Sequence, residues 1–342
     1  RVPGAMMHTN SVANMMFGAI SGSGVAAASA MGTIIGPIAE QDGYERDDMA
    51  TINIATAPTG LLIPPSNVLI TYSLVSGGTS VAALFMGGYI PGILWGLGCM
   101  IVGFFIARKK GYVSKERVTA KQALKITLDA IPSLLLIIIV IGGIITGIFT
   151  ATEGSVVAVV YSLILSLFFY KTITPKELYT IFKESAESTG LIVFLIGVSS
   201  IMAWVMAFTG IPAAVSNALL SISSNKYVIL LIINIVLLFI GTFMDITPAV
   251  LIFTPIFLPI CQGFGMSAIQ FGIMITFNLC IGTITPPVGN ILFVGVKVAK
   301  TKIENVMAKL IPYYVAIIIV LLLTTYIPEI SMWLPTIMGY SK

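Results

Sequence analysis

The chain has 342 residues, of which 57% are hydrophobic and only 9% are charged. Soluble domains carry about 25% charged residues, so this composition excludes a soluble globular protein and indicates a protein embedded in a bilayer. The formal net charge of +4 does not indicate a nucleic-acid partner, because the positions of the charges in a membrane protein matter more than their sum.

The first predicted element is a pair of short helices, 11–20 and 25–35, on either side of the sequence Ser21-Gly22-Ser23-Gly24. Each half is shorter than the roughly 20 residues that cross a bilayer core. The pattern predicts a re-entrant hairpin whose tip leaves backbone groups unpaired at membrane depth, where protein, water or an ion must satisfy them. Taken alone, the motif also fits a packing seam of small residues between helices.

A helix broken by prolines follows the acidic loop 40–48. The predicted span 49–73 is interrupted at Thr59-Gly60-Leu61-Leu62-Ile63-Pro64-Pro65-Ser66-Asn67. Two prolines remove two N–H donors and displace the carbonyls three and four residues before them. The freed oxygens could coordinate Na⁺, and the helix that starts after the break directs its positive dipole end to a place where a substrate carboxylate could lie. A simple kink is the alternative for a single Pro pair.

Four apolar spans come next, at 81–107, 131–150, 155–170 and 190–209. Glu153 lies between two of them, and we expect it to mark their turn. The amphipathic stretch Thr174–Ser188 is expected to lie along the membrane interface as an arm.

The interrupted elements then recur. A second hairpin is predicted from 227–240 and 246–260 around the tip 241–245, and a second broken helix around Pro286-Pro287. Asp245 lies in this tip, and an ionisable group at membrane depth indicates function. The alternative is that Asp245 caps the helix that follows it.

The recurrence has a fixed register. Gly36-Pro37 aligns with Leu258-Pro259 and Gly60–Pro65 with Gly282–Pro287 at a shift of 222 residues, and Pro91 aligns with Pro312 at 221. Five predicted spans separate the copies, and an odd number of crossings makes the copies inverted. Inverted repeats are typical of secondary transporters. Residues 125–223 precede the second copy without a counterpart before the first, so about 100 N-terminal scaffold residues are expected ahead of Arg1.

Fourteen of the eighteen Lys and Arg residues fall in three segments, 108–125, 171–183 and 297–309. The positive-inside rule predicts that these segments are cytoplasmic and leaves the C-terminus on the periplasmic side. The three cysteines are isolated in apolar sequence and are expected to be packing residues. His8 is the only histidine and has no ligand set around it, so sodium is the only metal ion expected.

At the Ser21–Gly24 hairpin, the acidic loop and the paired Pro-Pro motifs, the chain resembles the large membrane subunit of tripartite ATP-independent periplasmic (TRAP) transporters of the sialic-acid and C4-dicarboxylate kind. The resemblance implies an all-α polytopic membrane protein of the bacterial inner membrane that works as a Na⁺-coupled elevator, without an organic cofactor. The transport domain would be 10–107 and 226–330, and the scaffold 115–215. A small membrane subunit and a soluble periplasmic substrate-binding protein would be its partners.

The resemblance also implies two symmetric Na⁺ sites and a substrate site between them. The residues of the first Na⁺ site would be Ser21, Gly22, Ser23, Gly24, Gly60, Pro64, Ser66 and Asn67. Those of the second would be Gly241, Thr242, Met244, Asp245, Gly282, Thr285, Pro286, Gly289 and Asn290. The substrate would contact Ser23, Thr59, Asn67, Asp245, Thr283 and Asn290.

The predicted function is Na⁺-coupled import of an organic acid delivered by the binding protein. A one-component carrier of the same inverted-repeat design is the alternative within transport. An intramembrane enzyme is less favoured, because its site would need clustered His, Asp or Glu or a nucleophile and base; no catalytic residues are assigned. A passive channel is also less favoured, because no ring of like charges lines any span.

Overall fold

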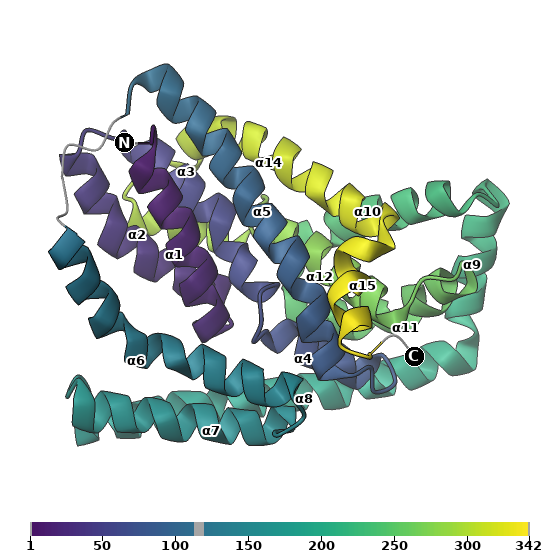
Figure 1. The fold of residues 1–342 in the computed structure, drawn as a ribbon. Coiled ribbons are helices and arrows are strands. Elements are labelled where there is room, and N and C mark those ends of the chain that lie inside the picture. The colour runs from purple at the N-terminus through teal and green to yellow at the C-terminus, as the bar shows by residue number, and fades with distance from the viewer. Residues whose placement is uncertain (1, 113–119, 341–342) are drawn as a thin grey trace. The chain divides into compact units, whose positions relative to one another are not determined.

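The computed structural model describes residues 2–112 and 120–340, without the side chains of 120–127 and of Ala151. Every regular element among them is helical (Figure 1). Seven of these helices are long and apolar enough to cross a membrane: Val81–Lys110, Leu128–Ile145, Thr152–Phe169, Pro175–Thr209, Lys226–Phe243, Ile246–Gly263 and Ile303–Tyr326. The protein is therefore an all-helical membrane protein with several spans.

The contacts between residues divide the chain into two compact units, 1–115 with 202–342, and 116–201. The first unit contains α1 (Ala5–Ser21), α2 (Gly24–Gln41), α3 (Arg46–Thr56), the 3-10 turn η1 (Ala57–Leu61), α4 (Asn67–Val75), α5 (Val81–Lys110), α9 (Ile211–Ile222), α10 (Lys226–Phe243), α11 (Ile246–Gly263), α12 (Ala268–Gly282), α13 (Asn290–Val298), α14 (Ile303–Tyr326) and α15 (Pro328–Ile337). The second contains α6 (Ala120–Ile145), α7 (Ala151–Ile164), the π-helical segment η2 (Leu165–Phe169) and most of α8 (Pro175–Thr209).

The repeat seen in the sequence also sets where the helices start. α2 and α11 start at 24 and 246, α3 and α12 at 46 and 268, and α5 and α14 at 81 and 303, which is a shift of 222 each time. α4 and α13 start at 67 and 290, a shift of 223, because the second Pro break is one residue longer. Both Pro-Pro bonds, Pro64-Pro65 and Pro286-Pro287, are cis.

The helix bounds differ from the predicted ones in three places. The hairpin helices are longer than expected, and α10 and α11 are each as long as a full span. The predicted arm and the span after it form one helix, α8, which starts at a capping box between Thr174 and Glu177. Gly190 is the strongest helix breaker where the arm meets the span, but one glycine costs a helix only about 1 kcal/mol. The helix therefore continues through it. The short helix α9 was not predicted.

In the unit 116–201, α6 and α7 are joined by a tight turn. Thr150 caps α7, and the Glu153 carboxylate accepts a hydrogen bond of 2.8 Å from the Thr150 backbone N–H. This capping box confirms that Glu153 marks the turn between the two helices. Tyr161 then ties α7 to α6 by donating to the carbonyl of Pro132 at 2.8 Å.

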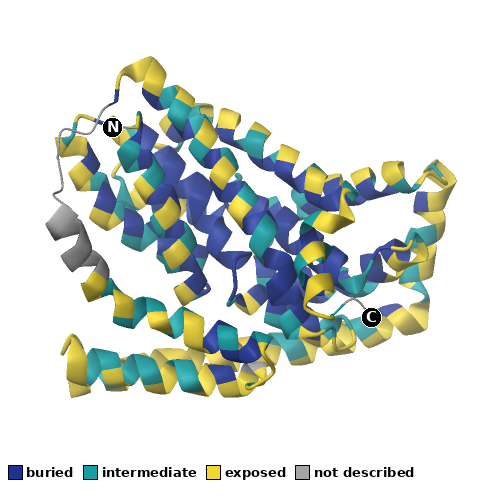
Figure 2. Ribbon diagram, viewed as in Figure 1, coloured by how far each residue is buried: buried dark blue, intermediate teal, exposed yellow. Residues whose placement is uncertain are grey.

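The core of the larger unit consists of α3, η1 and α12, whose residues are buried almost without exception (Figure 2). Trp95 of α5 is fully buried, donates to the carbonyl of Ala55 at 2.8 Å and lies 4.7 Å from the ring of Phe277, centroid to centroid. The three cysteines are free and buried, which confirms them as packing residues.

Two pairs of glycines bring each hairpin against a broken helix. A Cβ built on Gly60 would lie 2.1 Å from the Cα of Gly18 in α1. In the second copy, a Cβ on Gly282 would lie 2.2 Å from the backbone carbon of Gly241 in α10. Both contacts are between backbones, so only glycine permits the helices to approach this closely.

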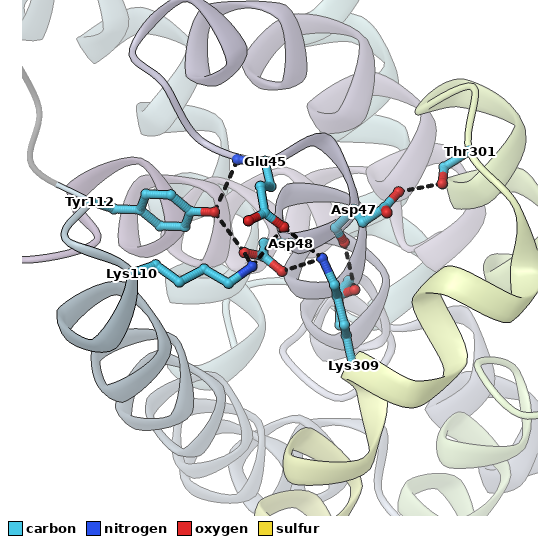
Figure 3. A network of polar contacts seen from close by, with 8 residues as sticks. Glu45, Asp47, Asp48, Lys110, Tyr112, Thr301 and Lys309 are labelled. Carbon is cyan, nitrogen blue, oxygen red and sulfur yellow. Dashed lines mark hydrogen bonds and ion pairs between the residues drawn. The ribbon is translucent and has the colours of Figure 1, made fainter.

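An ionic network joins the N-terminal end of α3 to the ends of α5 and α14 (Figure 3). Asp48 is only 4% exposed, and its two carboxylate oxygens pair with Lys110 and Lys309, each at 2.7 Å. Glu45 pairs with the same two lysines at 2.6 and 3.0 Å. Tyr112 donates to Asp48 at 2.8 Å. Lys110 and Lys309, which belong to two of the Lys-rich segments, therefore lie side by side.

The network lowers the pKa of both acids. Burial by itself raises the pKa of Asp48, but hydrogen bonds from Lys110, Lys309 and Tyr112 outweigh it and hold this pKa below its ordinary value. Hydrogen bonds from Lys110 and Lys309 likewise lower the pKa of Glu45. Groups with a depressed pKa in the folded state stabilise it above their unfolded pKa of about 4, and this stabilisation is lost as the pH falls through the folded pKa.

We expect Gly60→Ala and Gly282→Ala each to destabilise the protein by more than about 3 kcal/mol, because the added methyl collides with backbone that cannot rotate away. Thermal unfolding of the purified protein in detergent measures the effect. Gly98→Ala is the control, since its Cβ would meet no atom closer than 3.7 Å. Equal melting temperatures for all three variants would contradict the close approach.

We expect Asp48→Asn to lower stability by about 1–3 kcal/mol, because it leaves two lysines without their buried partner. The cost stays below that of a fully buried pair, since the lysines are about one third exposed and Glu45 remains. Thermal melts at pH 7 measure it, and the difference from the wild type should shrink as the pH falls below about 4. Glu40→Gln, which breaks the exposed pair with Arg46, is the control and should change little.

Candidate functional site

The tip of the first hairpin is the break between α1 and α2. Gly22 ends α1 with φ of 60°, and Ser23 caps α2 by accepting a hydrogen bond from the N–H of Ala26 at 3.2 Å. The Ser21 hydroxyl lies 3.3 Å from the backbone N of Ser23. Gly22 also lies against Asn67: a Cβ built on Gly22 would be 3.2 Å from the side-chain amide nitrogen of Asn67. The tip therefore contacts the residue at which α4 begins.

The break of the first broken helix runs from Leu62 to Ser66, between η1 and α4. Ser66 caps α4, and its hydroxyl donates to the carbonyl of Leu61, one of the carbonyls displaced by the prolines. Thr59 is buried in η1, and its hydroxyl donates to the carbonyl of Thr56 at 2.6 Å. Asn67 is exposed, so its amide lies open beside the tip.

The second tip has the same position but a different side chain. Asp245 is the N-cap residue of α11, yet its carboxylate makes no capping hydrogen bond. It accepts instead from the amide of Asn290 at 3.0 Å, and Asn290 is the first residue of α13. The carbonyl of Thr242 accepts from the backbone N–H of Val288 at 3.1 Å. This tip is therefore docked onto the break of α12 and α13, and the interpretation of Asp245 as a simple helix cap does not hold.

The carbonyls displaced in the second break are largely partnered by the protein. Tyr314 of α14 donates to the carbonyl of Ile284 at 2.6 Å, and the carbonyl of Thr283 accepts from the backbone of Ile291 at 3.0 Å. The hydroxyls of Thr283 and Thr285 donate to carbonyls of α12 at 2.6 and 2.8 Å. Gly289 turns the chain into α13 with φ of 22°. This contact of Tyr314 was not predicted from the sequence.

Helices of one copy pack on helices of the other. α2 contacts α13, and α4 contacts α11. A Cβ on Gly24, the first residue of α2, would lie 2.4 Å from the side chain of Ile291, which follows Asn290. The start of α13 therefore contacts the first tip through Ile291 and the second tip through Asn290. The residues predicted for two Na⁺ sites thus lie around one junction.

Two clusters of buried amides lie within the helices that carry the tips and breaks, and they were not predicted. Asn14 of α1 donates to the hydroxyl of Thr56 at 2.8 Å and to the side chain of Asn53 at 3.0 Å. In the second copy, Asn278 of α12 donates to Asn234 of α10 at 2.7 Å. Thr56 and Asn278 are equivalent at the shift of 222. An amide within an otherwise apolar helix was the signal that could have found them.

The site has groups that suit a weakly bound hard cation and groups that suit an anion. Its donors are serine hydroxyls, asparagine amides, backbone carbonyls near the breaks and the single carboxylate of Asp245. The starts of α4 and α13 add helix N-termini, which attract negative charge. Among the residues that the structure describes, no three His, Cys, Asp or Glu side chains gather to hold a metal ion. This donor set suits Na⁺, which unwound transporter helices bind through neutral oxygens.

Comparison with known proteins gives the family. Residues 1–330 match the family described as "Tripartite ATP-independent periplasmic transporter, DctM component". The uncharacterized protein YgiK of Salmonella typhimurium is 50% identical over 341 residues, which cover 100% of this chain and 78% of that protein. The isethionate TRAP transporter permease protein DctMQ of Oleidesulfovibrio alaskensis is 37% identical, over 97% of this chain and 52% of that protein.

A third relative is the sialic acid TRAP transporter large permease protein SiaM of Vibrio cholerae. It is 33% identical over 342 residues, which cover 100% of this chain and 80% of that protein. The match over nearly the whole chain agrees with the all-helical membrane fold of several spans. The chain belongs to the DctM family, the large permease component of bacterial TRAP transporters, and it is a transporter component rather than an enzyme.

Proposed function

We propose that this protein imports an organic acid across the bacterial inner membrane, coupled to Na⁺, by an elevator movement of its two repeats. The observation that carries this proposal is that each hairpin tip touches the asparagine that starts the second half of the broken helix in its own copy. The two pairs are Gly22 with Asn67 and Asp245 with Asn290. A site built twice, once from each inverted copy, suits a carrier that exposes one site to either side in turn.

Na⁺ is proposed at each pair of tip and break. Docking of the second tip onto the break, through Thr242 and Val288, supports a re-entrant hairpin even though α10 and α11 are each long enough to span. The broken helix, α5, α6, α7 and α8 lie between the copies, and α9 is too short to add a crossing. This odd number of crossings supports the inverted orientation, with the first hairpin entering from the cytoplasm and the second from the periplasm.

The proposed moving part consists of 10–107 and 226–330, and 115–215 belongs to the scaffold. Residues 113–119 lie outside the described part of the chain, so the basic segment 108–125 is described only in part. Lys110 and Lys309 share the carboxylates of Glu45 and Asp48, which supports placing their two segments on the same, cytoplasmic side. The segment 171–183 is proposed to lie on that side as well.

The substrate is proposed to be a small acid with a carboxylate or sulfonate group. The names of two relatives specify isethionate and sialic acid, and a C4-dicarboxylate remains a candidate from the family resemblance. A small membrane subunit and a periplasmic binding protein are proposed as partners; the relative named DctMQ is about twice as long as the part this chain matches. A one-component carrier is the competing design.

Uptake into liposomes tests this function. The large and small subunits are reconstituted together, and uptake of labelled isethionate, succinate and N-acetylneuraminate is measured with and without a Na⁺ gradient and with and without the binding protein. We expect one acid to accumulate only when both are present. Full activity without the binding protein would favour the one-component carrier, and accumulation that ignores Na⁺ would overturn the proposed coupling.

We expect Asp245→Asn, Ser23→Ala and Asn290→Ala to weaken Na⁺ coupling. Asp245→Asn removes the carboxylate from the second tip and should raise the half-saturating Na⁺ concentration about 10-fold or more, which corresponds to about 1.4 kcal/mol. The two neutral substitutions should have smaller effects. Glu304→Gln and Asn225→Ala, which change a carboxylate and an amide far along the chain from the site, are the controls. An unchanged Na⁺ dependence in all three site variants would remove the site assignment.

A further inference from the structure

A cavity of about 720 Å³ lies between α2, α3 and α13, further along α2 and α13 than the hairpin tips. This volume lies within the range of about 300–1,000 Å³ that small-molecule sites occupy. Its lining includes polar side chains: Asn10 and Asn53 are 1% and 2% exposed, and the hydroxyl residues Ser29 and Thr33 come from α2.

The charge at this cavity is positive. Arg46, Lys297, Lys300 and Glu40 all line it. Arg46 and Glu40 neutralise each other through two hydrogen bonds of 2.8 Å. Lys297 and Lys300 form no ion pair with any residue that the structure describes. Two ammonium groups therefore remain available to an anion in the cavity.

The backbone holds Lys300 at this place. Lys300 has φ of 51°, a left-handed conformation that glycine adopts far more readily than lysine. The next residue, Thr301, is hydrogen-bonded to Asp47 at the start of α3. The turn after α13 is thus fixed against α3, and a lysine occupies a position at which helices usually end with glycine.

The cavity and the transport site share a seam. α2 and α13 meet at Gly24 and Ile291 beside the two tips, and they meet again at Gly32 and Val298, where a Cβ on Gly32 would lie 3.0 Å from the valine side chain. Thr33 is nine residues along α2 from Gly24, which corresponds to about 13 Å. Further along this helix contact than the tips, Lys297 and Lys300 line the cavity.

We propose that this cavity is a second anion site, which holds the carboxylate or sulfonate of the transported acid after it leaves the tips. The inference rests on the proposed function, because it takes the ligand to be the transported acid. Lys297 and Lys300 bind the acidic group, while Asn10 and Thr33 offer hydrogen bonds to the rest of the molecule. Because both lysines belong to the segment 297–309, the site lies on the proposed cytoplasmic side of the tips and serves release.

Thiol labelling tests the site without any transport step. Thr33→Cys places an exposed thiol at the cavity wall, and the three native cysteines are buried and should react slowly. The variant is reconstituted with the small subunit in open membrane sheets. Rates are measured for a negatively charged sulfonatoethyl and a positively charged trimethylammonioethyl methanethiosulfonate. We expect the anionic reagent to be favoured, and the ratio of rates to fall at least threefold when Lys297→Gln and Lys300→Gln are added.

Lys302→Gln is the matched control, because it removes the same charge from the same segment but does not line the cavity. Lys300→Gly removes the same charge as Lys300→Gln, and it guards against misfolding because glycine adopts the left-handed backbone conformation without strain. A ratio that stays the same in the double variant, or falls equally in Lys302→Gln, would overturn the proposal.

Protection identifies the source of the anion. Isethionate, succinate and N-acetylneuraminate are each added at millimolar concentration to the Thr33→Cys variant, in membranes with and without phosphatidylglycerol. The measurement is whether the acid slows the reaction of an uncharged thiol reagent with the introduced cysteine. Protection by the acid that is taken up in the transport assay, lost in the double lysine variant, supports the site. Protection by phosphatidylglycerol alone would overturn it in favour of a lipid headgroup. A protein that labels as expected but takes up no acid would refute the proposed function and leave the positive cavity standing.

Discussion

The close approach of Gly18 to Gly60, and of Gly241 to Gly282, is the contact on which the geometry of the site depends. Backbone groups released by a Pro-Pro break need partners, and those that face the apolar interior cannot obtain them from water. Because the glycines let each hairpin lie directly on a break, the second tip can offer the carbonyl of Thr242 to the break. The same approach sets each tip beside Asn67 or Asn290.

The ionic network around Asp48 holds the start of the first broken helix. It joins α3, α5 and α14 through one buried carboxylate that receives two lysines. Between this end and the tips, the amide of Asn14 donates to the side-chain oxygen of Asn53 inside the packed helices. The first broken helix is therefore anchored at its start, and its break near the tip is where polar groups stay accessible. Asn67 is exposed there, whereas Asp48 is buried.

Much of this architecture could be predicted because prolines and glycines interrupt helices by local chemistry. Pro64-Pro65, Pro286-Pro287 and the glycines of the tips mark every break that the structure contains in these elements. Helix lengths were harder to predict, since Glu40 and Gln41 are compatible with both helix and loop, and α2 continues through them. Contacts between distant helices, such as Tyr314 with Ile284 and Lys309 with Asp48, depend on tertiary packing that no local pattern encodes.

The two copies have the same order of helices but differ in the charge of their tips. Under the proposed function, this difference favours movement of the anion in one direction. The Ser23 hydroxyl caps α2, whereas the Asp245 carboxylate makes no capping hydrogen bond to α11 and accepts from the amide of Asn290 instead. Under the proposed coupling, a cation at the second tip is offset by Asp245, while a cation at the first tip keeps its charge. An acidic substrate is then drawn toward the first tip, where α2 begins. That helix leads along its contact with α13 to Lys297 and Lys300, so the asymmetry of the tips and the positive cavity favour movement of the anion toward the same side.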